Sequence, residues 1–410
     1  NKDKNIPKRR FKAFENADAW ELRKLGEYST LITKGTTPRD KSGIGVVNFV
    51  KVENLVNGDI IPLQKIQLEE HEGYLKRSQL IENDILFSIA GTLGRTAIVK
   101  KSILPANTNQ ALSIIRGYEF DRNFLVTILR GVVVREFIKR NPTIGAQPNL
   151  SLEQVSNLCL LTPCSEEQSA IGTFFSTLDR HITLHQRKLD TLKEQKKTYL
   201  KLLFPSKGQT KPALRFQGFE DDWEEVKLGE VLSVSKLKNK ENEYSKLNVL
   251  SVSREQGTVN QIEYQGRSFA SDDVSGYKIV NVGQMIYTKS PLKGAPYGIF
   301  QTVTINGIVS PLYAVYNSSG RALASFVSLI LKEDAIATHY LSPLVTKGAK
   351  NTINVTDEGA LEGKVKIPTL PEQQAIGTFF QTLDREISQV EDKRASLKEL
   401  KKTLLRKLFV

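Results

Sequence analysis

Few residues of this chain have the type and spacing that support catalysis or metal binding. It has two cysteines, Cys159 and Cys164, and four histidines among its 410 residues. The histidines are His71, His181, His185 and His339. Only His181 and His185 have the spacing of two ligands on one helix face, and no carboxylate stands at a fixed offset to complete a site. We therefore expect no metal site, and we interpret the two cysteines as ordinary thiols of a reducing compartment.

Motifs for nucleotide binding and methyl transfer are incomplete. The nearest approach to the Asn/Asp-Pro-Pro-aromatic loop of DNA adenine methyltransferases is Asn141-Pro142-Thr143-Ile144, which lacks the second proline and the aromatic residue. Gly43-Ile44-Gly45 is too short to indicate a dinucleotide fold, and the sequence has no Gly-x-x-x-x-Gly-Lys-Ser/Thr loop. Because candidate triads and paired carboxylates are also missing, the sequence predicts a chain without a catalytic site.

The charge of the chain favours a polyanion as its partner. It carries 58 Lys and Arg against 45 Asp and Glu, which gives a net charge of +13 at pH 7. A distributed basic surface suits DNA, although charge alone does not separate DNA-binding proteins from other basic proteins. The sequence has no run of eighteen apolar residues, and residues 1–4 are polar. We therefore expect neither a membrane span nor a signal peptide, and we expect a cytoplasmic protein.

The chain repeats itself. Residues 170–175 and 375–380 are identical, and the match continues through 177–180 and 382–385 at the same offset of 205 residues. The beginnings of the copies also match, as Arg10-Phe11 with Arg215-Phe216, and Trp20 with Trp223. The stretches between the matched ends share little. Similar ends with dissimilar middles predict one scaffold that carries two different readers.

The repeated segments have the heptad periodicity of a coiled coil. Apolar residues recur at alternating steps of four and three over four to five heptads, which favours a coiled coil over an ordinary amphipathic helix. The predicted seam residues are Ile171, Phe175, Leu178, Ile182, Leu189, Leu192, Tyr199, Leu203, Ile376, Phe380, Leu383, Ile387, Val390, Leu397, Leu404 and Leu408. Two seams in one chain bury each other most simply. We favour antiparallel pairing, because parallel pairing needs a connection along the whole rod.

Polar residues of the helices leave some interpretations open. Lys196 and Lys401 occupy the same seam position in both copies, and they either fix the register or extend their ammonium groups into solvent. His185 also lies on the seam and is expected to be packed or partly exposed. At the helix starts, the pairs Ser165 with Gln168 and Thr369 with Glu372 predict capping boxes.

Both globular stretches predict mixed α and β structure with the same order of elements. Strand-like runs at 46–52, 85–90, 96–99 and 111–115 precede a helix near 123–140, and runs at 246–253, 284–288, 297–301 and 311–316 precede a helix near 323–341. The fold class is therefore α+β, with two globular domains, two long antiparallel helices and a pseudo-twofold repeat. The predicted boundaries are 1–162 and 211–367 for the globular domains, and 163–210 and 368–410 for the helix segments.

The helix starts resemble a known family, the specificity subunits of type I restriction-modification systems. The stretch 163–180, with Glu167-Gln168, Ile171 and Leu178-Asp179, resembles the family's Pro…Glu-Gln-x-x-Ile…Leu-Asp signature, and 368–385 repeats it. Three elements of the first globular part are similar to family loops: Lys34-Gly35-Thr36-Thr37-Pro38, Gly91-Thr92-Leu93-Gly94-Arg95 and Asn109-Gln110. The second part departs from the pattern, because Lys289-Ser290-Pro291 stands where Gly-Thr-x-Gly is expected.

This resemblance implies a function in DNA recognition. In this family each globular domain is a target recognition domain that reads one half of an asymmetric, interrupted DNA site. The helices act as a spacer and as the docking surface for two adenine-methylating subunits, and a motor-nuclease (restriction) subunit joins them. The resemblance implies that S-adenosylmethionine, ATP and Mg²⁺ belong to those partners, and that this chain binds double-stranded DNA in a bacterial or archaeal cytoplasm without a cofactor of its own.

Candidate DNA contacts lie in predicted loops, of which residues 236–240 form a basic loop and the others contain glycine or proline. They are Lys34, Thr36, Thr37, Arg39, Arg95, Lys236, Lys238, Lys240, Lys289 and Lys293. Lysine and arginine at such positions mostly contact phosphates, whereas arginine, asparagine and glutamine can also read base edges. Two other functions remain open: a coiled-coil adaptor whose globular domains bind proteins, and an enzyme such as a nuclease with an unrecognised site.

Overall fold

The computed structural model describes residues 5–56, 58–140, 149–254, 256–348 and 353–409. The chain divides into two compact units. The first unit contains residues 1–189 and 390–410, and the second contains residues 190–389. Each unit therefore combines one globular part with a portion of both helix segments.

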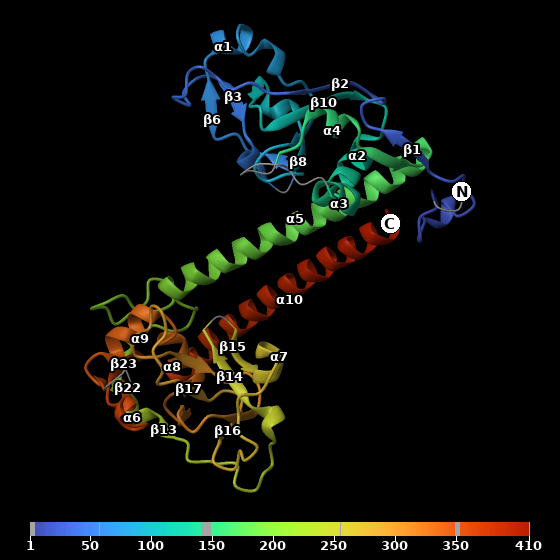
Figure 1. Ribbon diagram of the computed structural model, residues 1–410. Coiled ribbons are helices and arrows are strands. Elements are labelled where there is room, and N and C mark those ends of the chain that lie inside the picture. Colours follow the sequence, from blue (N-terminus) through green and yellow to red (C-terminus); the bar gives the residue numbers. More distant parts are fainter. Residues whose placement is uncertain (1–4, 57, 141–148, 255, 349–352, 410) are drawn as a thin grey trace. The chain divides into compact units, whose positions relative to one another are not determined.

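Two long helices form where the heptad seams predict them. Helix α5 spans Ser165–Leu202 and helix α10 spans Leu370–Leu408 (Figure 1). Acidic residues in the first turn and basic residues in the last turn complement the helix dipole in both. All sixteen predicted seam residues are buried or half-buried. The long-helix fold that the sequence predicts is confirmed.

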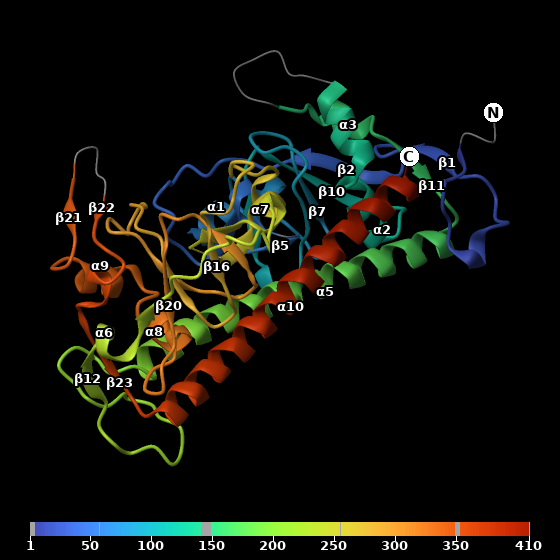
Figure 2. The same ribbon diagram turned by 90° about the horizontal axis from the view of Figure 1, so that it is seen from below.

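The helix pairing is antiparallel in the first unit. The N-terminal segment contacts both helices, because Arg10 forms an ion pair with Glu167 near the start of α5 and the backbone N–H of Arg9 donates to the carbonyl of Lys407 near the end of α10. Figures 1 and 2 both show the start of α5 beside the end of α10. In this unit, the two helices therefore run in opposite directions.

The second unit repeats this arrangement with the helices exchanged. Arg215 forms an ion pair with Glu372 near the start of α10, and the backbone N–H of Leu214 donates 2.9 Å to the carbonyl of Leu202 at the end of α5. Phe216 meets Phe379 edge-to-face at 5.8 Å between ring centroids. The pairing within this unit is therefore antiparallel as well.

A four-stranded antiparallel sheet forms the centre of the globular part in the first unit. Its strand order is β2-β10-β7-β8. The strands are β2 (Ser29–Lys34), β10 (Leu112–Tyr118), β7 (Ile85–Ser88) and β8 (Thr96–Ile98). Strands β1 (Glu21–Lys24) and β11 (Cys159–Thr162) pair antiparallel, so the globular part begins and ends at the same place, beside the start of α5.

The second unit has the same sheet topology. Its four-stranded sheet has the order β13-β20-β17-β18. The strands are β13 (Ser233–Val234), β20 (Ala314–Asn317), β17 (Met285–Tyr287) and β18 (Phe300–Thr302). Strands β12 (Glu224–Lys227) and β23 (Lys364–Ile367) close this globular part as β1 and β11 close the first.

Smaller elements surround these sheets. In the first unit they are β3 (Val47–Val50), β4 (Leu55–Val56), β5 (Asp59–Ile60), β6 (Gln64–Ile66), β9 (Ala106–Thr108), α1 (Leu68–Glu72) and α4 (Leu152–Ser156). In the second unit they are α6 (Leu228–Val231), β14 (Leu250–Ser253), β15 (Gly257–Asn260), α7 (Gln261–Gln265), β16 (Lys278–Val280), β19 (Gly307–Val309), β21 (Thr346–Lys347) and β22 (Ile353–Asn354). The element order thus remains mixed α and β in both units.

The single helix predicted near the end of each globular part is wrong in both cases, because each is broken into two. The first unit has α2 (Arg122–Leu129) and α3 (Val132–Arg140), separated at Gly131. The second unit has α8 (Ala324–Ile330) and α9 (Asp334–Leu341). Glycine is a poor helix residue, which accounts for the first break, whereas the sequence around the second break has no such signal.

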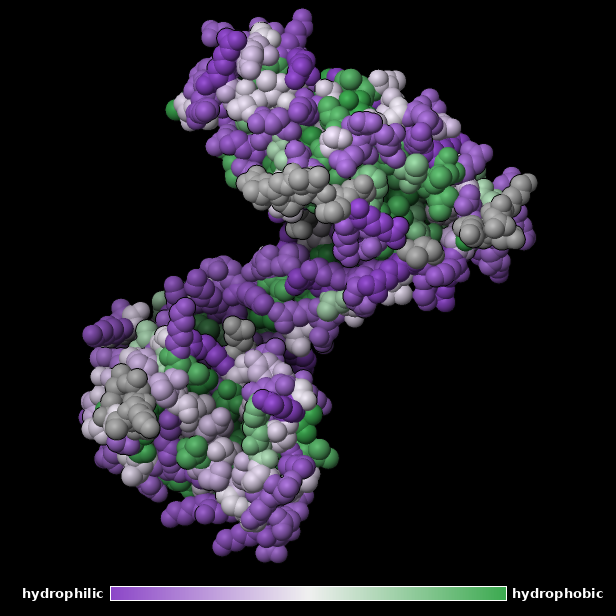
Figure 3. Space-filling view, viewed as in Figure 1, coloured by the Kyte–Doolittle hydropathy of each residue, from purple (hydrophilic) through white to green (hydrophobic). Residues whose placement is uncertain are grey.

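An aromatic cluster joins each globular core to the helix ends. In the first unit Trp20 meets Phe409 at 5.7 Å and Phe124 at 6.4 Å between ring centroids. In the second unit Trp223 meets Phe204 and Phe326, both at 5.8 Å. Both indoles are buried. The face shown in Figure 3 is largely hydrophilic, with smaller apolar areas on both globular parts.

Candidate nucleic-acid interface

Three loops converge at one end of the sheet in the first unit. The strand register pairs Lys34 with Ser113, Ser88 with Leu112, and Thr96 with Phe87. The end of β2, the end of β7, the start of β8 and the start of β10 therefore lie together. The loops that leave this end are 35–38, 89–95 and 109–111. They contain the three elements that resemble family loops. The sheet topology therefore brings together three motifs that are distant in the sequence.

Close backbone packing fixes the first of these loops. The N–H of Thr36 donates 2.9 Å to the carbonyl of Thr108, and the Thr37 hydroxyl contacts the side chain of Gln110. A Cβ atom at Gly35 would lie 2.0 Å from the carbonyl oxygen of Thr108. Only glycine permits this approach, which explains the glycine of the Gly-x-Thr-Pro loop. Lys34 and Thr37 are exposed beside the backbone held in this way.

The serine at the end of β7 positions the second loop. The hydroxyl of Ser88 donates 2.6 Å to the carbonyl of Thr92 and accepts 2.8 Å from the N–H of Arg95. Gly91 and Gly94 take positive φ angles of 72° and 81°, which glycine adopts without strain. The side chain of Arg95 is exposed and donates 3.2 Å to the carbonyl of Val52. The turn thus presents one arginine at the loop end of the sheet.

Arg39 is held by an aromatic ring. Its guanidinium lies 4.2 Å from the ring centroid of Tyr74, and its backbone N–H donates 2.7 Å to a carboxylate oxygen of Glu70. Arginine stacked on a ring keeps its planar donors available to a phosphate or a base edge. Arg39 is therefore a preorganised candidate contact.

The second unit builds the corresponding loop end with different residues. The register pairs Val234 with Tyr316, and Tyr287 with both Ala314 and Phe300. The loops 235–240, 288–299 and 310–313 therefore leave the same end of the sheet. Four candidate residues are exposed there: Lys236, Lys238, Lys240 and Lys293. The loop 288–299 is longer than its counterpart 89–95, and this difference lies at the position of the missing Gly-Thr-x-Gly element.

Lys289 requires a correction to its predicted role. Its ammonium is mostly buried and forms an ion pair with Asp357, which also accepts 2.6 Å from Lys278. A lysine that is already paired and largely desolvated cannot approach a phosphate as a free surface cation does. In the structure, Lys289 fixes the loop backbone. The hydroxyl of Thr36 is also buried, so a contact through it is not accessible in this structure. The other eight candidates stay predicted DNA contacts.

Sequence reasoning missed a buried latch at the start of each long helix. Arg10 donates through Nε and Nη2 to both carboxylate oxygens of Glu167, at 2.8 and 2.6 Å. Arg215 holds Glu372 in the same way, at 2.8 and 2.7 Å. The hydrogen bond that each arginine donates to its glutamate raises the pKa of that arginine. Both pairs are separated by 157 residues and both repeat at the offset of 205, a signal that the sequence already contained.

The glutamine of the Glu-Gln signature ties the helix to the globular part. Gln168 donates 2.9 Å to the carbonyl of Pro163 and accepts 3.0 Å from the backbone N–H of Asp121. Gln373 contacts Pro368 and Leu323 in the same manner. The predicted capping boxes are therefore wrong, because Gln168 and Glu372 use their side chains for these longer-range contacts.

The histidines and cysteines form no site among the residues that the structure describes. His185 contacts the backbone carbonyl of His181 at 2.8 Å, and both cysteines are free and exposed. Within the described ranges, no group of three His, Cys, Asp or Glu side chains could hold a metal ion. The Asn141-Pro142-Thr143-Ile144 segment lies outside the described residues.

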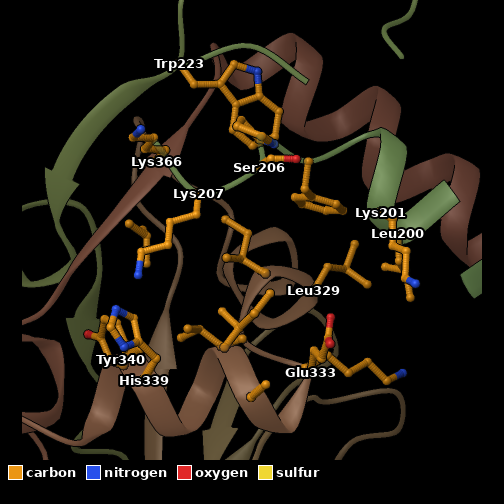
Figure 4. Close-up of a pocket in the computed structure, with 18 of the residues that line it drawn as sticks. Leu200, Lys201, Ser206, Lys207, Trp223, Leu329, Glu333, His339, Tyr340 and Lys366 are labelled. Carbon is orange, nitrogen blue, oxygen red and sulfur yellow. The ribbon is translucent and has the colours of Figure 1, made fainter. Parts of the chain in front are cut away.

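A groove of about 1010 Å³ lies on the second unit, away from the loop end. Figure 4 shows Leu200, Leu329 and Trp223 around it, together with Lys201, Lys207 and Lys366. The remaining apolar lining includes Phe204, Pro205, Ile330, Leu331 and Ile336, and the remaining basic lining includes Lys193, Lys196, Lys197, Lys332 and Lys364. The carboxylates among the described lining residues are those of Glu225 and Glu333. An apolar floor with a basic rim suits an acidic amphipathic segment.

Comparison with known proteins identifies the class to which these features belong. The sequence pattern described as the type I restriction modification DNA specificity domain matches residues 17–194 and, a second time, residues 220–399. The chain therefore belongs to the family of type I restriction-modification specificity subunits. The two matches coincide with the two copies of the internal repeat.

Individual relatives agree with this family. The chain is 24% identical to a putative type I restriction enzyme MjaX specificity subunit of Methanocaldococcus jannaschii, over 96% of this chain and 94% of that protein. It is 23% identical to the MjaVIII specificity subunit of the same organism, over 95% and 92% of the two chains. The crystal structure of the type I system S subunit from M. genitalium covers 99% of both chains with a TM-score of 0.65 at 15% identity, which shows the shared fold.

None of the helices that the structure describes has both the length and the apolar content needed to cross a membrane. The matching family model describes a DNA specificity domain, in agreement with the prediction of a DNA specificity subunit.

Proposed function

We propose that this chain reads an asymmetric, interrupted DNA site, one half with each globular part. One observation carries the proposal: equivalent sheets in the two units gather their loops at the same sheet end, but with unlike residues. The shared sheet topology places the loops of both globular parts in the same way. Because the loop residues differ, each globular part would prefer a different DNA sequence. The paired helices set the spacing between the two halves.

The loop ends supply two kinds of DNA contact. The exposed lysines at 34, 236, 238, 240 and 293 would hold phosphates, which contribute affinity without sequence preference. Arg39 and Arg95 have planar donors on a supported backbone, so they are suited to a guanine edge in the major groove. Thr37 is exposed in the same tight loop and would contact a phosphate oxygen, whereas the hydroxyl of Thr36 is buried in the structure.

We also propose that the chain has no catalytic site and that it recruits two adenine-methylating subunits, which in turn bring the motor-nuclease subunits. S-adenosylmethionine, ATP and Mg²⁺ would belong to those partners. The groove of the second unit supports a docking role, since its lysine rim complements an acidic amphipathic segment of a methylating subunit. Because the substrate is genomic DNA, the expected location is the cytoplasm of a bacterium or archaeon.

Methylation mapping tests the proposal directly. The chain is produced together with its methylating subunit, and modified adenines are mapped across a genome, with a catalytically inactive methylating subunit as the control. We expect one split motif with two unlike halves. A continuous palindrome, or no motif, contradicts the proposal.

A domain exchange tests whether the halves are read independently. Replacing residues 211–367 by the corresponding part of another family member should change one half of the motif and leave the other half as it was. A change in both halves contradicts independent reading. Partner binding without any effect on DNA would favour the coiled-coil adaptor, and DNA cleavage by the isolated chain would favour a nuclease.

A further inference from the structure

One carboxylate joins three separate segments at the loop end of the second unit. Asp357, which follows β22, accepts 2.6 Å from the ammonium of Lys278 on β16 and also accepts from the ammonium of Lys289 in the loop 288–299. Lys278 donates 2.6 Å to the backbone carbonyl of Tyr313 as well, in the loop 310–313. The carboxylate thus ties both loops to one point.

The backbone of the same residue is fixed from below. The phenol of Tyr316 on β20 donates 3.0 Å to the backbone carbonyl of Asp357. Tyr316 is fully buried in the sheet, so the anchor point of the carboxylate is part of the core. Asp357 therefore fixes the two loops relative to the sheet that they leave.

The charges of the cluster favour its ordered state. The side chains of Lys278, Asp357 and Lys289 are only 12%, 19% and 19% exposed. Burial alone would raise the pKa of Asp357, but the hydrogen bonds and charges of the two lysines outweigh it and hold the pKa below its ordinary value. At neutral pH the carboxylate is charged, and its removal would leave two neighbouring ammonium groups without their common anion.

The loop conformation needs such an anchor. Lys289 has a φ angle of 49°, in the left-handed region that a residue with a Cβ atom rarely adopts. A non-glycine residue stays in this region only where its surroundings hold it there. The ion pair with Asp357 supplies that constraint directly at the strained residue.

This cluster lies in the second unit and differs from the contacts that hold the equivalent loop of the first unit. The counterpart loop 89–95 of the first unit is held by the hydroxyl of Ser88, and no ion pair joins this loop to another of the described residues. The latch of Arg10 with Glu167, in contrast, recurs in the second unit and serves both copies. An ion-pair cluster found at only one of the two loop ends is expected to support the DNA sequence preference of that unit.

We propose that Asp357 is a positioning residue that sets the shape of the loops 288–299 and 310–313, and thereby the sequence preference of the second unit for its half of the DNA site. The proposal rests on the proposed function. Asp357 itself need not touch DNA, because its carboxylate would be repelled by phosphates and is covered by two lysines.

Selection from a DNA library tests this role. The full chain, in complex with its methylating subunit, selects from duplexes randomised in both halves of the wild-type motif, and Asp357→Asn is compared with Asp272→Asn. Asp272 is an exposed carboxylate of the same unit that pairs 2.6 Å from Lys246, so its loss changes the net charge equally. We expect Asp357→Asn to lower discrimination in one half by about tenfold, roughly the loss of one specific base contact.

The other readouts separate positioning from general damage. Discrimination in the other half and the preferences of Asp272→Asn should match the wild type, and affinity for random DNA should stay equal or rise, because a negative charge is lost. Unchanged preference of Asp357→Asn in both halves overturns the proposal while the proposed function stands. A wild-type complex that selects no split motif overturns both.

A second variant covers loss of folding. Lys289→Gln removes one arm of the cluster and leaves the pair of Asp357 with Lys278 in place. We expect relaxed preference in the same half, with a melting temperature close to that of the wild type. If Asp357→Asn unfolds and Lys289→Gln selects as the wild type does, Asp357 has a structural role only and the proposal is wrong.

Discussion

Lys401 in α10 places its ammonium 2.5 Å from a carboxylate oxygen of Asp179 in α5, within the first unit. In the second unit Lys196 of α5 pairs with Asp384 of α10. Each residue of one pair stands 205 positions from its counterpart in the other. The two seam lysines therefore do not simply extend into solvent: each ends on the aspartate of the Leu-Asp signature in the facing helix.

Each of these aspartates also faces a cation from the globular part. Arg130, at the break between α2 and α3, lies 3.8 Å from Asp179. Lys332 stands at the corresponding break between α8 and α9. Burial lowers the pKa of Lys332, and the charge of Asp384 partly opposes this. The signature aspartate thus pairs with the facing helix in both units, and in the first unit it also pairs with the globular part.

Removing the charge of Asp179 should destabilise the first unit. Asp179→Asn leaves the half-buried Arg130 and Lys401 without their common anion, so we expect a loss of about 1–2 kcal/mol in the free energy of unfolding, more than for an isolated surface pair. Urea unfolding is followed by the fluorescence of Trp20 in a Trp223→Phe background, because each unit has one tryptophan. Asp392→Asn, an exposed carboxylate on α10, should be neutral, and equal effects of the two changes would contradict a connecting role.

Breaking the latch should cost more than breaking the seam pair. The side chain of Glu167 is fully buried, so Arg10→Ala leaves a buried carboxylate without its counter-ion, and we expect about 3–5 kcal/mol of destabilisation. Arg215→Ala should do the same in the second unit, reported by Trp223. The double change Arg10→Met with Glu167→Gln should recover part of the loss. A double variant that is as unstable as Arg10→Ala would show that the charge is not the cause.

Local periodicity explains why the long helices could be predicted. A heptad seam repeats apolar residues at short, regular spacing. Helices α5 and α10, together with their antiparallel pairing, could therefore be predicted from the sequence. The partner of Lys401 lies 222 residues away, and periodicity contains no distance between helices. The two interpretations of Lys196 and Lys401 therefore stayed open until both helices were placed.

The loop end shows the same limit for the candidate site. Glycine and proline marked most of the candidate loops, because these residues favour particular backbone conformations that do not depend on distant contacts. Whether a lysine in such a loop is free depends on a distant partner, and Asp357 is 68 residues from Lys289. The sequence contained a signal for the ion pair of Arg10 with Glu167, since both residues recur as Arg215 and Glu372. A repeat, however, identifies equivalent positions and does not show which residues are in contact.

An acidic side chain in the groove should weaken docking of a methylating subunit. Ile336 lines the groove and is 44% exposed, so Ile336→Asp should fold normally. If an acidic amphipathic segment binds there, burial of this carboxylate should weaken the complex by about tenfold or more, measured by titration calorimetry. Leu247→Asp, at a position that is 62% exposed and outside the groove lining, is the matched control. If both variants bind the methylating subunit with the affinity of the wild type, the groove is not the docking site.

Neutralising the basic loop of the second unit should change the salt dependence of DNA binding. Lys236, Lys238 and Lys240 are exposed at the loop end, and each lysine that contacts a phosphate contributes about 0.9 to the slope of log affinity against log salt concentration. The triple change to glutamine should therefore reduce the slope and weaken binding to specific and random duplexes alike, because phosphate contacts do not report sequence. Lys207→Gln, which removes an exposed lysine at the groove, should leave the slope unchanged. If the triple variant keeps the wild-type slope, these lysines do not contact the duplex, and the affinity of the second unit must come from other residues at the loop end.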